Sequence, residues 1–207
     1  MSVVELQVPV SEAAVRALRV GDQVRLHGVI VTARDAAHKY IIDNFIRPVA
    51  VPESERAIHA ELKRLWYEGV VYHCGPVVSR DASGTWHFVS AGPTTSIREE
   101  PYEADVISHF GLRAVIGKGG MGPKTLAACQ ERGAVYLHAV GGAATLIARS
   151  VEEVLAVYKR EELGTPEAFW VIRVAGFPAV VTMDAAGESL HEKIFAASNQ
   201  KLGELIG

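Results

Sequence analysis

The sequence predicts an α/β domain with some parallel strand pairing, and three observations support this fold class. Apolar strand-like runs alternate with short helical stretches, above all in the second half of the chain, a rhythm typical of α/β domains. Glycine-rich turns separate these runs. Of the 207 residues, 49% are hydrophobic and 22% are charged, which is the balance of a globular protein with a sizeable core. We therefore expect a single domain over residues 1–207.

Local signals place the elements of the first half. Ser11 can cap a short helix that follows the first strand, and Asp35 is expected to cap another, which Pro48 ends. Pro101 suits the first position of a further helix, whose inner face carries apolar residues four apart. The expected elements are strands over residues 3–8, 23–31, 70–73 and 85–91, and helices after Ser11, over 36–45, over 53–65 and from 101.

The second half repeats a unit of strand, glycine loop and helix. A strand over 113–116 leads into the loop 117–122 and then into a helix from Pro123 to Arg132, with Gly133 just after it. Proline favours the first position of a helix and glycine the position that follows its last turn. The other expected elements are a strand over 134–140, a helix over 143–150 and a hairpin over 169–183.

Charge and residue counts exclude several classes of function. The formal net charge is −3, whereas nucleic-acid-binding domains are usually basic. Neither a bilayer-spanning apolar run nor a signal-peptide pattern is found, so we expect no membrane partner and a cytoplasmic location. Two cysteines are too few for a disulfide scaffold or for the ligands of an iron–sulfur cluster. The eight histidines show no metal-ligand spacing, so we expect no metal site in this chain.

The glycine loop is the strongest isolated motif. Gly117, Gly119 and Gly122 fit the pattern G-x-G-x-x-G between a strand and a helix, where a dinucleotide fingerprint should lie. However, the next strand does not end in the acidic residue that would hold a ribose, and Lys118 is not followed by the Ser or Thr of a P-loop. A less specific prediction is an anion site made by backbone N–H groups, the helix N-terminus and Lys118.

Two further polar segments are ambiguous from the residues alone. Thr94, Thr95 and Arg98 lie on a tight turn after a strand, although Ser96 and Glu99 in the same segment also satisfy a capping box. The residues alone do not decide whether this segment serves a functional site or only caps a helix. In the segment TARDAAHKY, the simplest interpretation is a solvated helix start with Asp35 as the cap and with Arg34 and His38 exposed.

Taken in order, these segments resemble one family. The resemblance is to the C-terminal domain of class I fumarases and to the β subunit of L-tartrate dehydratases, and it covers roughly residues 6–191. Each segment alone is weakly specific, but the ordered set is highly specific. The segments are 20–22, 34–38, 74–76, 91–96 with Arg98, 116–122 and 141–144.

The resemblance implies a swivelling β/β/α domain, with a mixed sheet of strand–loop–helix units, that closes over a larger α subunit. In such enzymes the α subunit binds a [4Fe-4S] cluster whose open iron takes the substrate hydroxyl. The chain would thus act in a heterodimer or an α2β2 complex, hydrating fumarate to L-malate reversibly and contributing no cluster ligand of its own.

The resemblance also assigns roles to individual residues. Arg34, Arg98 and Lys118 would hold a small dicarboxylate, for which guanidinium forks are well suited, and preorganised cations would stabilise charge that develops on the carboxylate oxygens. Thr94 would occupy the place of the family's proposed base, although a free hydroxyl needs an activating neighbour. One departure from the family is that Glu99-Glu100 directly follows Arg98. The expected supporting residues are Asp35, His38, Thr95, Gly117 and Gly119.

The sequence is also compatible with three alternative functions. The segments GKGGMGP and LGTPEAFWVIRV also resemble the L-tartrate dehydratase β subunit, which would act on tartrate to form oxaloacetate, and mesaconate is a further candidate substrate. A second alternative is a non-catalytic module that binds a nucleotide or anion at the glycine loop. A third is a purely structural subunit.

Overall fold

The computed structural model describes residues 3–206 and confirms the α/β class. A seven-stranded mixed sheet has the order β1-β2-β3-β6-β7-β9-β8, and a separate hairpin is formed by β4 and β5. The strands are β1 (Val4–Gln7), β2 (Gln23–Thr32), β3 (Val70–Tyr72), β4 (Val77–Arg80), β5 (Trp86–Ser90), β6 (Ala114–Gly117), β7 (Val135–His138), β8 (Val151–Tyr158) and β9 (Phe169–Met183).

Helices fill the connections between the strands. Besides the α-helices, residues 3–206 contain one π-helix, η1, and two short 3-10 helices, η2 and η3. The helices are α1 (Glu12–Ala17), α2 (Asp35–Ile41), η1 (Ile42–Ile46), η2 (Glu53–Glu55), α3 (Arg56–Trp66), η3 (Ser96–Arg98), α4 (Glu103–Phe110), α5 (Pro123–Arg132), α6 (Ala144–Ala148), α7 (Arg160–Leu163) and α8 (Leu190–Ile206).

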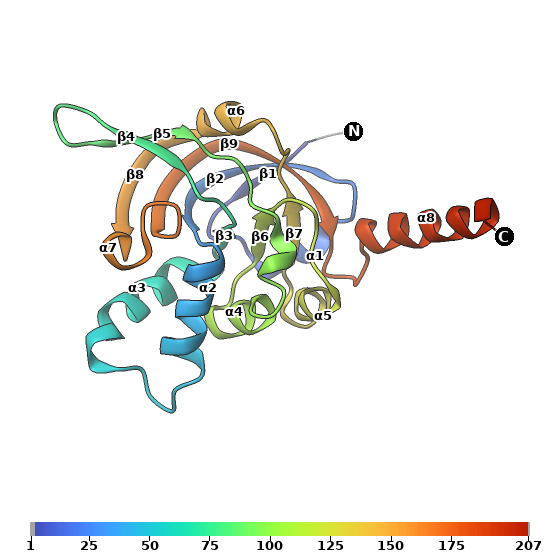
Figure 1. Cartoon of the computed structure of the whole chain (residues 1–207), viewed down its shortest axis with the longest axis horizontal. Helices are drawn as coiled ribbons and strands as arrows, with labels where there is room; N and C mark the ends of the chain where they lie inside the picture. The colour runs from blue at the N-terminus through green and yellow to red at the C-terminus, as the bar shows by residue number, and fades with distance from the viewer. Residues whose placement is uncertain (1–2, 207) are drawn as a thin grey trace.

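The main sheet closes on itself. Strands β1, β2, β3, β6 and β7 pair in parallel, whereas β9 runs antiparallel to β7, β8 and β2. Because β9 pairs with both β2 and β7, the strands β2, β3, β6, β7 and β9 form a closed ring. One core, which includes Tyr72, Trp170 and Phe177, packs against the hairpin β4–β5, and a second core lies under helices α2 to α5. Figure 1 shows these helices below the strands and the hairpin above them.

Several local expectations are confirmed. The Ser11 hydroxyl accepts a hydrogen bond from the Ala14 N–H at 3.2 Å and so caps α1. Helix α5 begins at Pro123, and Gly133 follows it in the left-handed conformation with φ 64°. These boundaries depend on signals within one turn of the chain, which is why the residues alone identify them.

The expected hairpin over 169–183 is wrong, because this stretch is the single strand β9. Ala175 and Gly176 together face His27 of β2, so the pairing register shifts there without reversing the chain. Gly176 has φ 65°, a conformation that glycine adopts readily. The Gly-Phe-Pro segment therefore marks a β-bulge rather than a turn. Strand β8 and helix α8 had no counterpart among the expected elements.

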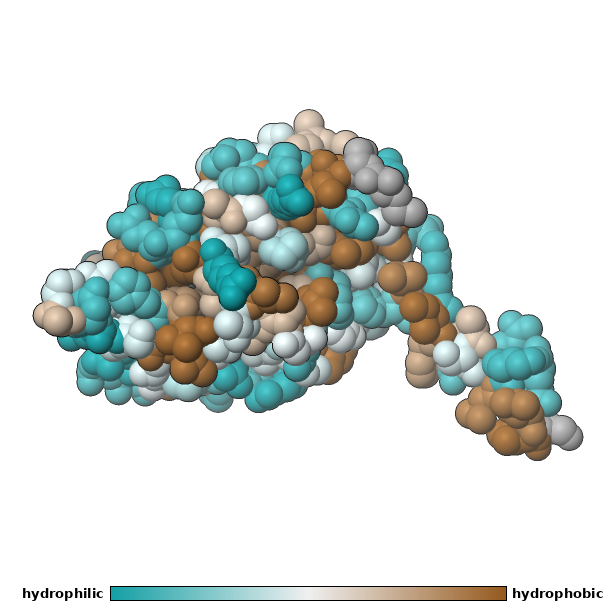
Figure 2. All heavy atoms as spheres, turned by 90° about the horizontal axis from the view of Figure 1, so that it is seen from above, coloured by the Kyte–Doolittle hydropathy of each residue, from teal (hydrophilic) through white to brown (hydrophobic). Residues whose placement is uncertain are grey.

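Helix α8 projects from the body of the molecule (Figure 1). Its exposed hydrophobic side chains are visible on the projecting segment in Figure 2. None of the helices in residues 3–206 has both the length and the apolar character needed to cross a membrane. The exposed hydrophobic residues of α8 are Ile194, Phe195, Leu202, Leu205 and Ile206.

Candidate functional site

Three segments singled out by the sequence meet at one edge of the sheet. The Arg34 turn follows β2, and the glycine loop follows β6, so both lie at the carboxyl ends of parallel strands. Such ends are the usual position of ligand sites in α/β sheets. The Thr94–Ser96 segment joins them through the backbone, because the Thr94 N–H donates to the His73 carbonyl at 2.6 Å, just after β3.

The Thr94–Ser96 segment runs alongside the glycine loop. The Lys118 N–H donates to the Thr94 carbonyl at 3.1 Å, and the Ser96 N–H donates to the Lys118 carbonyl at 2.9 Å. These bonds form a parallel bridge between Thr95 and Lys118. In residues 3–206, the Thr94 hydroxyl has no hydrogen-bond partner and the Lys118 ammonium has no ion-pair partner. Among the described residues, none is therefore hydrogen-bonded to Thr94 so as to activate its hydroxyl.

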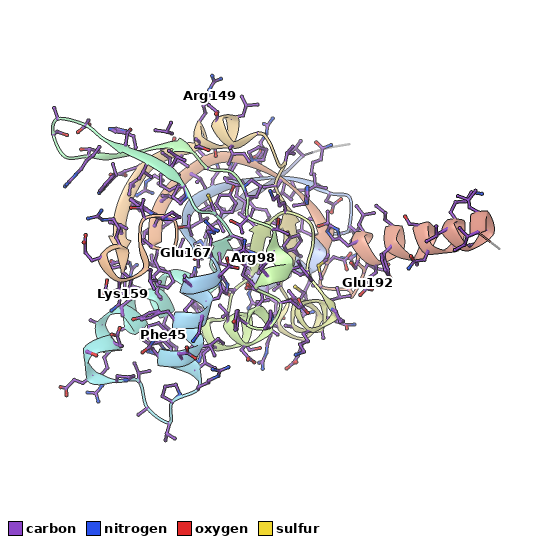
Figure 3. The ribbon with its side chains drawn as sticks, in the orientation of Figure 1. Phe45, Arg98, Arg149, Lys159, Glu167 and Glu192 are labelled. Atoms are coloured by element: carbon purple, nitrogen blue, oxygen red, sulfur yellow. The ribbon has the colours of Figure 1, made fainter. Side chains whose placement is uncertain are left out.

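A row of alternating charges crosses the start of α2. Arg34 Nε lies 3.3 Å from Glu167 Oε1, and Arg34 Nη2 lies 3.9 Å from Asp35 Oδ2. The same Asp35 oxygen accepts a hydrogen bond from Arg98. Arg98 and Glu167 stand at the two ends of the row and are labelled in Figure 3. The Arg98 side chain is 54% exposed and the Arg34 side chain 22% exposed, so Arg98 has room to reorient toward a ligand.

Asp35 does not cap α2 as expected. Arg34 is the N-cap, and Asp35 is the first helical residue, so the Asp35 carboxylate turns to Arg98 instead of to the helix N–H groups. Glu167 takes over the capping function, because its Oε2 accepts from the Ala36 N–H at 3.0 Å. Glu167 is far away in the chain, which explains why no local signal predicted it.

The glycines of the loop make room for side chains of the protein itself. A Cβ atom on Gly117 would lie 1.8 Å from Ser96 Oγ, one on Gly120 would lie 2.5 Å from the His191 ring, and one on Gly122 would lie 2.6 Å from a Glu100 carboxylate oxygen. Gly119 has φ 80°. The G-x-G-x-x-G pattern is thus accounted for by packing and backbone conformation, without a dinucleotide.

Of the anion site expected at the glycine loop, the part at the N-terminus of α5 is not available to a ligand, because Glu100 fills it. The Glu100 carboxylate accepts from the N–H groups of Gly122 at 2.8 Å, Lys124 at 2.9 Å and Thr125 at 3.3 Å, and from the Thr125 hydroxyl at 2.6 Å. A carboxylate is favoured at a helix N-terminus by the same electrostatics that would attract a ligand anion. Glu100, one of the two residues after Arg98 that differ from the family's usual pattern, therefore has a structural role as the cap of α5.

A buried polar cluster lies beneath these loops and was not predicted. His38 and His73 are fully buried, and each places its Nε2 atom 2.9 Å from Glu103 Oε2. His38 Nδ1 lies 2.9 Å from the Arg34 carbonyl oxygen. The expectation that His38 is exposed is therefore wrong. The His–Glu–His spacing spans 65 residues, so no sequence motif could reveal it.

The other end of the cluster involves Ser96. His73 Nδ1 lies 2.9 Å from Ser96 Oγ, which also accepts a hydrogen bond from the Tyr136 hydroxyl at 2.9 Å. The short helix η3 that starts at Ser96 has no side-chain cap. Ser96 therefore does not act as the capping box that was one of two interpretations of this segment.

Burial and charge set the protonation of the cluster. Burial alone would raise the pKa of Glu103, but the charges and hydrogen bonds of His38 and His73 outweigh it and lower this pKa to about 2. Burial alone would lower the pKa of His38, but Glu103 outweighs it and raises this pKa. Burial lowers the pKa of His73, which Glu103 offsets only in part. The charged form is thus favoured for Glu103 and His38 and disfavoured for His73.

Glu99 is a second buried acid near the cluster. Burial raises its pKa to about 8, and the nearby Asp35 carboxylate adds to the shift. Neither Glu99 oxygen has a hydrogen-bond partner in the described part of the chain. We therefore take Glu99 as protonated at neutral pH.

Fold and site together define an α/β domain with a β/β/α arrangement, in which charged loops gather at one sheet edge and the glycine loop is filled by protein side chains. The model of the family described as "Fumarase C-terminus" matches residues 1–194, and the chain belongs to this family. The resemblance found in the sequence is thus confirmed. The matched region ends within α8.

Curated relatives support the same family. The chain is 48% identical over 202 residues to a "Putative fumarate hydratase class I" of Geobacillus stearothermophilus, with 98% of this chain but only 36% of that relative covered. It is 41% identical to a "Putative L(+)-tartrate dehydratase subunit beta" of Methanocaldococcus jannaschii, with 93% of each chain covered. It is 37% identical to the "L(+)-tartrate dehydratase subunit beta" of Escherichia coli K12, covering 97% of this chain and 94% of the relative.

Proposed function

We propose that this chain is the β subunit of a hydro-lyase that hydrates fumarate to L-malate reversibly, and that it supplies the groups that bind the dicarboxylate. The observation that carries the proposal is the pair of arginines, Arg34 and Arg98, that share Asp35 at the sheet edge. Such a pair is suited to a carboxylate, because Asp35 binds Arg98 by a hydrogen bond and lies within ion-pair distance of Arg34. The relative from Geobacillus stearothermophilus supports fumarate as the substrate.

The chain's own residues would act as follows. Arg98, which is half-exposed, would exchange its bond with Asp35 for one substrate carboxylate, and Arg34 would stay anchored on Glu167. Lys118 would add a third positive charge from the neighbouring loop. These cations would stabilise the charge that develops when a proton leaves the carbon next to a carboxylate. Thr94, adjacent to Lys118 through the backbone, is the candidate base.

An iron–sulfur cluster would have to belong to a partner subunit. Cys74 and Cys129 are fully buried, and burial raises the pKa of the Cys74 thiol to about 12, so neither suits a cluster. A [4Fe-4S] cluster held by an α subunit would supply a Lewis acid for the substrate hydroxyl. The partner subunit, its cluster and a swivelling movement of this domain all belong to this proposal.

The test is co-expression with an α subunit that carries the cluster cysteines, followed by assays on fumarate, mesaconate, L-malate and L-tartrate. We expect activity on fumarate and malate, and we expect Arg98→Ala to lower kcat/KM about 10- to 100-fold, since a hydrogen bond to a charged group is lost. Arg149→Ala is the matched control, because Arg149 is exposed at a distant surface (Figure 3). A cluster-loaded complex that is inactive on all four compounds would contradict the proposal.

L-Tartrate dehydratase activity, which forms oxaloacetate, is the second candidate. It is favoured by the near-complete coverage of the relatives from Methanocaldococcus jannaschii and Escherichia coli. Activity on L-tartrate that exceeds activity on malate in the same panel would select it. A nucleotide-binding module is disfavoured because Glu100 occupies the N-terminus of α5, and direct titration with NAD or ATP tests it.

A further inference from the structure

A continuous row of buried hydrogen bonds connects the Arg34 turn with the Thr94–Ser96 segment. It runs from the Arg34 carbonyl to His38, Glu103 and His73 and then to Ser96, with 2.9 Å at each of the four contacts. Both ends of the row therefore lie at segments that carry proposed substrate-binding groups. The row itself is fully buried and touches no surface from which substrate could approach.

The partners determine where the hydrogens must be. The Arg34 carbonyl can only accept, so His38 Nδ1 must donate, and the Glu103 carboxylate can only accept at Oε2, so His38 Nε2 must donate as well. Both nitrogens of His38 carry hydrogen, and the ring is an imidazolium. His73 differs, because its Nδ1 faces a hydroxyl. Tyr136 donates to Ser96, whose own hydrogen then points to His73 Nδ1, leaving His73 neutral.

We propose that His38 is a positioning residue for the dicarboxylate site, held permanently as an imidazolium by Glu103 and fixing the Arg34 turn through its bond to the Arg34 carbonyl. This inference rests on the proposed function for its catalytic consequence but not for its structural content. Arg34 is the N-cap of α2 in an extended conformation, so the bond from His38, one turn into the helix, sets where the Arg34 side chain departs.

Charged and titratable groups surround His38 on several elements. Glu103 contacts it from α4, Glu99 lies next to η3, and the neutral His73 packs edge-on from the end of β3, with ring centroids 5.1 Å apart. On its own helix, Asp35 is engaged by Arg98. Glu103 is thus the one carboxylate among these that bonds directly to the ring, so its negative charge maintains the proton.

The three groups could instead hold a metal ion, since one ligand atom from each lies within 4.8 Å of the others. The hydrogen-bonded arrangement is preferred because both Nε2 atoms lie at hydrogen-bond distance from the same carboxylate oxygen. It also gives the Arg34 carbonyl a second donor, besides the His38 N–H at 2.8 Å. Metal content of the purified protein separates the two arrangements.

The first experiment uses the full chain with [15N]histidine, observed by NMR at about pH 8, well above the ordinary histidine pKa of about 6.5. We expect one ring with both nitrogens protonated and expect its signals to be missing from His38→Gln. A neutral His38 at this pH, or one equivalent of metal bound by the three groups, would overturn the proposal. Because no activity is measured, this result is independent of the proposed function.

The second experiment is a double-mutant cycle in the complex with the α subunit. We expect His38→Gln to lower kcat/KM about 10- to 100-fold through misplacement of Arg34, with little further loss when Arg34→Ala is already present. His87→Gln, on the exposed hairpin, is the matched control. Independent, multiplicative losses would overturn the positioning role. A complex inactive on every dicarboxylate would contradict the proposed function while leaving the NMR result in place.

Discussion

Replacing Gly117 with alanine tests the tight contact between the glycine loop and the buried cluster. The backbone of Gly117 is not in the left-handed region, so alanine brings no conformational strain, and the whole effect is steric. The added Cβ would lie 1.8 Å from Ser96 Oγ, whereas the next atoms are the Tyr136 hydroxyl at 3.1 Å and His73 Nδ1 at 3.2 Å. The Ser96 hydroxyl must therefore move.

The cost follows from what Ser96 would lose. Its hydroxyl makes two buried hydrogen bonds, to His73 and from Tyr136, each worth about 1 kcal/mol. Overpacking adds about 1–3 kcal/mol. We expect Gly117→Ala to lower the free energy of unfolding by about 4 kcal/mol. Ser96→Ala alone should cost about 2 kcal/mol, because it removes the same two bonds.

The decisive measurement is the double mutant. Once Ser96→Ala has removed the hydroxyl, Gly117→Ala should cost only about 1 kcal/mol. The loss of stability in the double mutant should therefore be about 3 kcal/mol smaller than the sum of the losses in the two single mutants. Equilibrium urea unfolding followed by circular dichroism measures all four proteins. Gly203→Ala is the control, since nothing lies within 4 Å of the added atom and alanine favours a helix. Additive costs for the Gly117–Ser96 pair would refute the reasoning.

Three further predictions concern acidic residues. The pKa of Glu99 is raised to about 8 by burial, so the folded state keeps a proton that the unfolded chain releases, and stability should fall as the pH rises from about 4.5 to about 8. In urea titrations, Glu99→Gln should abolish this part of the pH dependence. An unchanged pH profile in Glu99→Gln would refute the prediction. The pKa of Glu103 is lowered to about 2, so its stabilisation should be present above about pH 4.5 and should be lost as the pH falls toward 2, a loss that must be missing from Glu103→Gln if the variant folds. Glu100→Ala should cost about 2 kcal/mol by removing the cap of α5, with hydrogen exchange accelerated at the start of that helix; equal exchange in both proteins would rule out the cap.

The sequence predicts the parts of the fold that depend on neighbouring residues. Pro123 and Gly133 bracket α5 as expected, and Ser11 caps α1. The predicted hairpin over 169–183 is wrong because a β-bulge and a turn use the same kinds of residue. Only the pairing of β9 with β2 distinguishes the two. Local pattern cannot contain that information, since the two strands are far apart in the chain.

In the candidate site, too, the contacts between distant parts of the chain were the ones not predicted. The resemblance predicts Arg34, Arg98 and Lys118 as binding residues, and their segments do meet at one sheet edge. Glu167 and Glu100, which cap α2 and α5, were not predicted, because each reaches its helix from another part of the chain. The cluster of His38, Glu103 and His73 was missed for the same reason. The assigned roles of Thr94, Thr95 and Gly119 stay predictions.

The closed ring of strands has a consequence for how the molecule is made. Strand β9 ends at Met183, and until it arrives β2 and β7 each lack the antiparallel neighbour that it supplies. A nascent chain thus carries unpaired backbone donors and acceptors until β9 has been made, a state prone to association with other chains. Folding of the closed ring must wait until β9 has been synthesised, and termination before residue 169 should yield aggregates rather than a smaller folded protein.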